Sequence, residues 1–112
     1  MNSYVQITTT TPSREDAARI ADVLIGRKLA ACVQIIDTID SIYRWDGKVE
    51  KATEWLCAVK TEKRLFAEVE AAIKDVHPYD VPEIIAFEVA AGSDDYLAWI
   101  SRELRQDGTP NP

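Results

Sequence analysis

Residues 32–60 read CVQIIDTIDSIYRW, then DG, then KVEKATEWLCAVK, so an Asp46-Gly47 pair separates two long strand-like runs. Asp-Gly between such runs is the strongest short-range signal of a β-hairpin, because a type I′ turn requires a positive φ at both central residues. The turn sets the register of the two arms and predicts that Trp45 pairs with Lys48. We therefore expect a long antiparallel hairpin at the centre of the fold.

The first arm of this hairpin should contain an irregularity. Its apolar positions change parity between Ile35 and Ile36, which predicts a bulge there. With the register set at the turn, Cys57 lies opposite Ile36, about 13 Å along the strand from the position opposite Cys32. A disulfide needs Cα atoms within about 7 Å. We therefore expect two free thiols, with Cys57 as a small core residue.

Outward from the hairpin, the periodicity of the apolar residues predicts strands at 4–10 and 81–90, and helices at 14–28, from Thr61 to 76, and from Ser93 onward. This order is that of an α+β, ferredoxin-like βαββαβ fold with an added C-terminal helix. Two helices would cover one face of a four-stranded antiparallel sheet. Residues 1–106 would form this single domain, and residues 107–112 a flexible C-terminal tail.

The composition fits one globular domain. The chain has 112 residues, of which 46% are hydrophobic and 29% charged, and that length suits one core. The formal net charge of −6 argues against nucleic acid as a partner, because phosphate binding needs a positive field. Nothing is long and apolar enough for a membrane span, and no secretory signal is visible. We therefore expect a cytoplasmic protein with reduced cysteines.

The predicted hairpin is too long for a domain of this size. Arms of about 14 residues reach about 46 Å, whereas a compact chain of this length is roughly 35 Å across. The tip carries Ile42, Tyr43, Trp45 and Val49, and a projecting apolar edge invites aggregation unless another chain covers it. We expect a closed homo-oligomer whose hairpins pair across subunits. A hairpin that coils over its own sheet is the alternative.

Residues 77–83 read HPYDVPE, the densest polar and conformationally restricted stretch of the chain. An imidazole, a phenol and two carboxylates on a segment stiffened by two prolines are typical of a ligand site. The same residues also suit helix termination before Pro78, with His77 capping the last carbonyls, so both interpretations stay open. A structural zinc site takes about four ligands, mostly Cys and His. A cation here would therefore need carboxylates or a second subunit.

Lys60-Thr61 closes the second arm directly before the next predicted helix. An ammonium group beside a helix N-terminus would make an anion site, and an ordinary N-cap with a solvated lysine is the alternative. The chain has no P-loop, GxGxxG, GxSxG or HExxH motif, so no motif points to an enzyme.

The motifs together resemble one known family. The matching strings are Ala31-Cys32-Val33-Gln34-Ile35, Ser41-Ile42-Tyr43-Arg44-Trp45-Asp46-Gly47-Lys48-Val49-Glu50, Lys60-Thr61, His77-Pro78-Tyr79-Asp80-Val81-Pro82-Glu83-Ile84 and Tyr96-Leu97-Ala98-Trp99-Ile100. In order and over about residues 4–104, they resemble the CutA family of divalent-cation tolerance proteins. The resemblance implies a ferredoxin-like protomer, a homotrimer, structural kinship with PII-type signalling proteins, and a link to copper and other divalent cations.

The resemblance carries a copper site over only in part. Some bacterial members are credited with a site made from a Cys at the end of the first strand and two adjacent His before Pro-Tyr. This chain has Thr9 at the first position, Val76 at the second and His77 at the third. The resemblance therefore implies at most weakly bound Cu²⁺ or another divalent cation, with His77 as the one retained metal ligand.

We therefore expect a cytoplasmic, trimeric, non-enzymatic binding protein involved in divalent-cation tolerance. Its ligand cleft would be lined by Lys60, His77, Tyr79 and Glu83. Its partners would be its own copies, a metal ion and an unidentified protein. The alternative is a PII-like sensor of a small anion or nucleotide that acts through a partner protein, in which case Lys60 would matter more than His77.

Overall fold

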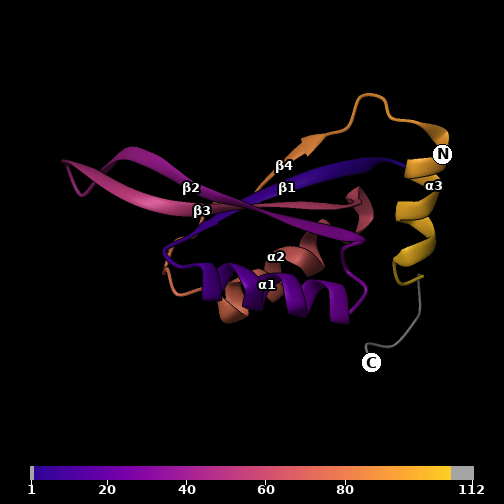
Figure 1. The fold of residues 1–112 in the computed structure, drawn as a ribbon, viewed down its shortest axis with the longest axis horizontal. Coiled ribbons are helices and arrows are strands. Elements are labelled where there is room, and N and C mark those ends of the chain that lie inside the picture. The colour runs from indigo at the N-terminus through magenta and orange to yellow at the C-terminus, as the bar shows by residue number, and fades with distance from the viewer. Residues whose placement is uncertain (1, 107–112) are drawn as a thin grey trace.

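A computed structural model describes residues 2–106 of the chain. The elements are β1 (Tyr4–Thr11), α1 (Arg14–Gly26), β2 (Cys32–Trp45), β3 (Lys48–Glu62), a 3₁₀ turn (Lys63–Leu65), α2 (Phe66–Val76), β4 (Ile85–Glu88) and α3 (Asp94–Glu103). All the strand pairs are antiparallel, in the order β2-β3-β1-β4. Helices α1 and α2 lie under one face of the sheet, and α3 stands at its end (Figure 1). This arrangement confirms the ferredoxin-like α+β prediction with its added third helix.

The core forms between the sheet and the two covering helices. Alternate residues of β1 and β3 face the helices, among them Val5, Ile7 and Val59, which are at most 2% exposed. They meet the apolar stripes of α1 and α2, in which Leu24 and Ile73 are fully buried. The predicted strand and helix periodicities therefore point into the same core.

The hairpin has the turn and register that Asp46-Gly47 predicts. Asp46 and Gly47 both have positive φ, 53° and 78°, and Trp45 pairs with Lys48. The bulge, however, lies between Ile36 and Ile39, not between Ile35 and Ile36. Ile35 and Ile36 are neighbours in a regular part of the strand, so their side chains point to opposite faces of the sheet. The change of parity arises because both faces carry apolar residues here.

Because of the bulge, the residue that pairs with Cys57 differs by one position from the predicted partner. Cys57 pairs with Ile35, not Ile36, and Cys32 pairs with Lys60. Both thiols are free and Cys57 is buried, as predicted.

The second helix starts later than predicted. Thr61 does not cap it, because β3 continues to Glu62 and α2 begins at Phe66. Thr61 pairs with Val5 on the helix-covered face, and its hydroxyl donates a 2.7 Å hydrogen bond to the Leu29 carbonyl. Thr61 is therefore a buried strand residue whose hydroxyl bonds a loop carbonyl, and not the expected N-cap of the helix.

The fourth strand is shorter than predicted, at Ile85–Glu88 instead of 81–90. Pro82 lacks the N–H that a ladder position needs, which opposes pairing at the predicted start. After the strand, the Val89 N–H still donates a 2.9 Å bond to the Tyr4 carbonyl. The predicted tail at 107–112 lies outside the described residues.

The hairpin projects from the domain. Figure 1 shows the tip of β2 and β3 extending well past the ends of α1 and α2, and the described chain measures 44 × 30 × 23 Å. Ile42 and Trp45 at the tip are 67% and 56% exposed. On the sheet face opposite α1 and α2, Ile85 and Phe87 are also exposed. Within residues 2–106, no helix is long and apolar enough to cross a membrane.

Candidate functional site

A cleft of about 650 Å³ lies between the hairpin and the loop after α2. Its lining residues come from β1, from both arms of the hairpin and from this loop: Thr10, Ser41, Ile42, Tyr43, Trp45, Glu54, Pro78, Tyr79, Asp80, Val81 and Glu83. Three of these residues are carboxylates, and no lysine or arginine is among them. The charges lining the cleft are therefore all negative, which favours a cation over an anion.

His77 joins the loop to the end of β1. One ring nitrogen, Nε2, lies 2.8 Å from the Thr10 carbonyl oxygen, and a carbonyl only accepts, so this nitrogen carries the proton. The other, Nδ1, accepts a 3.1 Å hydrogen bond from the Tyr79 N–H. Both nitrogens are thus used within the protomer. A metal ion at His77 would have to displace one of these hydrogen bonds.

Tyr79 reaches across the cleft to a buried carboxylate. Its hydroxyl donates a 2.9 Å hydrogen bond to Glu54 Oε2, and Glu54 is only 7% exposed. Burial raises the pKa of Tyr79 to about 12, and the hydrogen bond to Glu54 adds to that rise. The phenol therefore stays protonated and keeps one oxygen of Glu54 occupied.

Glu83 is held in a similar way from the other end of the loop. The Thr8 hydroxyl donates a 3.1 Å hydrogen bond to Glu83 Oε2, and Glu83 is otherwise exposed. Thr8 and Thr10 lie on the same face of β1. Strand β1 therefore anchors both ends of the loop, through the Thr8 side chain and the Thr10 carbonyl.

Lys60 lies outside the cleft. Its ammonium group donates a hydrogen bond to the side-chain oxygen of Gln34 on the neighbouring strand. It stands six residues along β3 from Glu54, a separation of about 20 Å. The helix that would have completed an anion site starts at Phe66, so the predicted pairing of Lys60 with a helix N-terminus is wrong.

None of the three positions suggested for copper lines the cleft, and this includes His77, which was expected there. Thr9 faces the covering helices opposite Cys57, is fully buried, and its hydroxyl has no hydrogen-bond partner in the structure. Val76 packs against the core at the end of α2. Across residues 2–106, no group of three or more His, Cys, Asp and Glu side chains is close enough to hold a metal ion.

Sequence reasoning found Tyr79 and Glu83 but missed Glu54. The second arm did contain a signal for Glu54. Leu56 and Ala58 lie on the same face of the strand as Glu54, so Glu54 is a charged residue in a row of apolar ones. A charged residue in such a row is buried only when it has a partner. The partner, Tyr79, comes from a segment far along the chain, which strand periodicity does not reveal.

The chain matches the family described as "CutA1 divalent ion tolerance protein" over residues 5–103. It is 45% identical to the divalent-cation tolerance protein CutA of Thermus thermophilus, over 81% of this chain and 88% of that protein. It is 44% identical to the Archaeoglobus fulgidus protein of the same name, over 93% and 99% of the two chains. For the chloroplastic CutA of Arabidopsis thaliana the identity is 41% over 86% of this chain, which spans about half (53%) of that protein.

Solved structures agree with the sequence comparison. The crystal structure of CutA1 from Oryza sativa superposes with a TM-score of 0.91 at 37% identity, over 95% of this chain and 97% of that one. The divalent cation tolerance protein of Thermus thermophilus gives a TM-score of 0.89 at 40% identity, over 91% and 99%. The likeness therefore covers the hairpin, the loop after α2 and α3 together.

Proposed function

The chain belongs to the CutA1 divalent ion tolerance protein family, and we propose that it binds divalent cations weakly, without catalysis, in the cleft between the hairpin and residues 77–83. The observation that carries the proposal is the charge of this cleft, which has Glu54, Asp80 and Glu83 in its lining and no basic residue. Such a lining raises the local concentration of cations.

The donor atoms favour one class of metal. Carboxylate, phenol and hydroxyl oxygens suit hard or borderline divalent ions, whereas Cu(I) prefers thiolate and thioether ligands. Thr9 and Val76 supply no such ligand, and the two nitrogens of His77 already have partners. Carboxylate oxygens of the cleft would therefore bind the ion together with ligands from neighbouring copies, because residues 2–106 of one protomer bring no three such side chains close enough. His77 would act by fixing the loop. Cu²⁺ would bind only where one His77 hydrogen bond opens.

We propose further that the functional unit is a homotrimer. One protomer lacks a metal-ligand cluster within residues 2–106, so neighbouring copies would have to complete the coordination. The exposed side chains beside the cleft support such packing, with Ile42, Trp45 and Val81 at 67%, 56% and 70% exposed. Contiguous apolar surface of this kind marks an interaction site.

The compartment and the partner are proposals of the same kind. The two free thiols suit a reducing compartment, and we propose the cytoplasm. The names of relatives include a chloroplastic and a periplasmic protein, so other members work elsewhere. The alternative of an anion or nucleotide sensor has no observation in its favour, since Lys60 is far from the cleft and bonded to Gln34.

The metal proposal is tested by adding Mn²⁺ or Cu²⁺ to ¹⁵N-labelled protein and following paramagnetic broadening of the amide signals. We expect broadening around Glu54, Tyr79 and Glu83, with affinity in the micromolar to millimolar range. Glu83→Gln should weaken binding at least fivefold, while Glu103→Gln on the exposed part of α3 should not change it. Nanomolar affinity that survives both Glu83→Gln and His77→Ala would place the metal elsewhere.

A further inference from the structure

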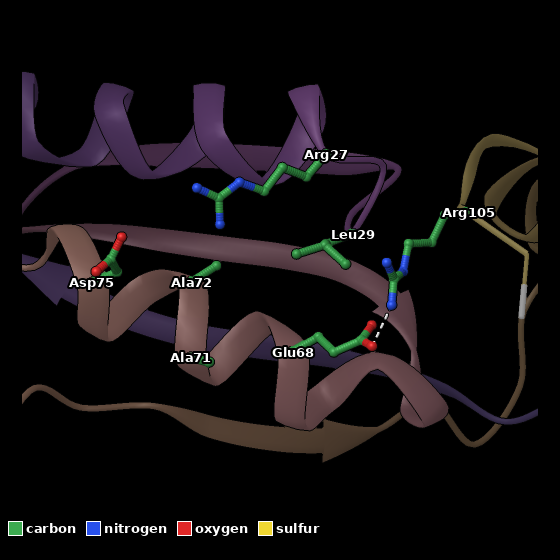
Figure 2. A pocket seen from close by; sticks show the side chains of 7 residues that line it. All are labelled: Arg27, Leu29, Glu68, Ala71, Ala72, Asp75 and Arg105. Atoms are coloured by element: carbon green, nitrogen blue, oxygen red, sulfur yellow. Dashed lines mark hydrogen bonds and ion pairs between the residues drawn. The ribbon is translucent and has the colours of Figure 1, made fainter. Parts of the chain in front are cut away.

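A second cavity, of about 270 Å³, lies on the other side of the molecule between α1 and α2. Figure 2 shows its lining side chains: Arg27 and Leu29 follow α1, Arg105 follows α3, and Glu68, Ala71, Ala72 and Asp75 come from α2. We propose that this groove, which we call the helix groove, binds a small zwitterion of the α-amino-acid class. This proposal does not depend on metal binding in the cleft between the hairpin and the loop after α2.

The floor of the helix groove is one face of α2. Residues 68, 71, 72 and 75 follow the i, i+3, i+4, i+7 spacing that places side chains in a row. Ala71 and Ala72 occupy the middle of that row, and their short side chains leave the space open (Figure 2). Glu68 and Asp75 stand at its two ends, about 10 Å apart along the helix axis. The floor is therefore apolar in the centre and acidic at both ends.

Two arginines face this floor from other elements. Arg105 is held in place, because its backbone N–H donates a 2.9 Å hydrogen bond to the Lys28 carbonyl and its guanidinium pairs with Glu68. Arg27 extends over Ala72 on the side of the groove where Asp75 stands (Figure 2). Among the described residues, the side chain of Arg27 forms no hydrogen bond or ion pair, although Arg27 is only partly exposed. A guanidinium in such a setting can bind a carboxylate through two parallel hydrogen bonds.

The acceptors of the groove are also incompletely satisfied. Glu68 Oε2 is buried and has no hydrogen-bond partner in the structure. The carboxylate of Asp75, which is exposed, has no side-chain hydrogen bond or ion pair within residues 2–106. A buried acceptor without a donor is costly, which applies to Glu68 Oε2, whereas the exposed carboxylate of Asp75 offers an ammonium group an unpaired negative charge.

The complementary ligand must therefore carry both charges. A simple anion would satisfy Arg27 but meet Asp75, and a simple cation would satisfy Asp75 but meet Arg27. A molecule with adjacent carboxylate and ammonium groups satisfies both and lays its carbon chain over Ala71, Ala72 and Leu29. The volume is slightly below the usual lower limit of about 300 Å³ for ligand pockets, which restricts the ligand to about the size of one amino acid.

The test is an NMR titration of the ¹⁵N-labelled full chain with three matched compounds. L-leucine carries both charges, 4-methylpentanoate lacks the ammonium group, and 3-methylbutylamine lacks the carboxylate. We expect L-leucine at millimolar concentration to shift the amides of Ala71 and Ala72. The two singly charged analogues should bind at least tenfold more weakly. Equal binding of either analogue would overturn the zwitterion assignment.

Variants locate the site. Arg27→Gln and Asp75→Asn should each weaken L-leucine binding at least tenfold. Arg19→Gln and Glu70→Gln change the same two helices outside the groove, at the ion pairs with Asp16 and Lys74, and should bind as the wild type does. The spectra themselves report whether each variant is folded. No shift at 20 mM L-leucine, or unchanged binding in both groove variants, would overturn the proposal, whatever the metal titration of the cleft shows.

Discussion

Glu54 is the one buried carboxylate among the residues that line the cleft. Its carboxylate is 7% exposed, and among residues 2–106 its hydrogen-bond donor is the Tyr79 hydroxyl. Sequence reasoning identified Tyr79 from the HPYDVPE stretch but not its partner, because the two are brought together by tertiary structure alone. Removing the donor should leave a buried acceptor unsatisfied.

Tyr79→Phe should therefore lower the free energy of unfolding by about 1–3 kcal/mol, measured by urea denaturation at pH 7. Tyr43→Phe, at an exposed phenol on the other wall of the cleft, is the matched control and should change it by less than about 0.5 kcal/mol. Equal effects of the two substitutions would contradict the role assigned to the Tyr79–Glu54 bond.

The same bond predicts a pH dependence with a definite sign. Burial and Glu54 raise the pKa of Tyr79 from 10.0 to about 12, so the folded state holds the proton more tightly than the unfolded state. The stabilisation is fully present below pH 10 and is lost as the pH rises towards 12. Ultraviolet titration of the tyrosines should show a late phase that shrinks in Tyr79→Phe, in which Tyr96, whose pKa is also raised by burial, still contributes. A wild-type titration that is complete by about pH 11 would contradict this.

Cys57 should be the less reactive of the two thiols. It is fully buried, and burial raises its pKa to about 11, so about one molecule in a thousand is a thiolate at pH 8. Alkylation with iodoacetamide, followed by mass spectrometry, should leave Cys57 unmodified in the native protein and label both thiols after denaturation without reductant. Failure to label either cysteine after denaturation would mean that a disulfide had formed.

Among the elements, the hairpin was the most predictable and the short strand β4 the least. Asp46-Gly47 determines its own turn through local backbone conformation, so the register near the tip follows from two residues. The positions of the bulge and of the start of α2 depend instead on tertiary contacts. Thr61 satisfies the Leu29 carbonyl in the core, and no local pattern announces that contact.

The turn offers a direct test of this local control. Gly47 has φ +78° and open space where a Cβ would stand, so Gly47→Ala meets no clash and changes only the backbone preference. We expect a loss of about 1 kcal/mol in the free energy of unfolding. Gly26→Ala is the control, because Gly26 lies in α1 with equally open space and should stabilise the protein by about 0.5–1 kcal/mol. A loss in both variants would point to a cause other than the turn conformation.

At the scale of the whole molecule, the projecting hairpin leaves Ile42, Trp45 and Val49 at its tip exposed within residues 2–106. The sequence indicated this from arm length alone, and the 44 Å long axis of the described chain agrees with it. The coiled-back hairpin considered as the alternative is not observed, since the tip extends away from the helices (Figure 1). The number of copies is not contained in one chain, and the trimer therefore stays a prediction.

Light scattering on the purified protein should give three times the chain mass of 12.6 kDa at micromolar concentration. Trp45, 56% exposed on the protomer, has the size and position of an interface anchor, and such anchors cost at least about 2 kcal/mol when truncated. Trp45→Ala should therefore raise the dissociation constant at least 30-fold, while Ile25→Ala, at a 44% exposed position on α1, should leave it unchanged. A wild-type mass of 12.6 kDa would contradict assembly. A stable dimer would agree with assembly through the exposed hairpin, but it would contradict the trimer that the family resemblance implies.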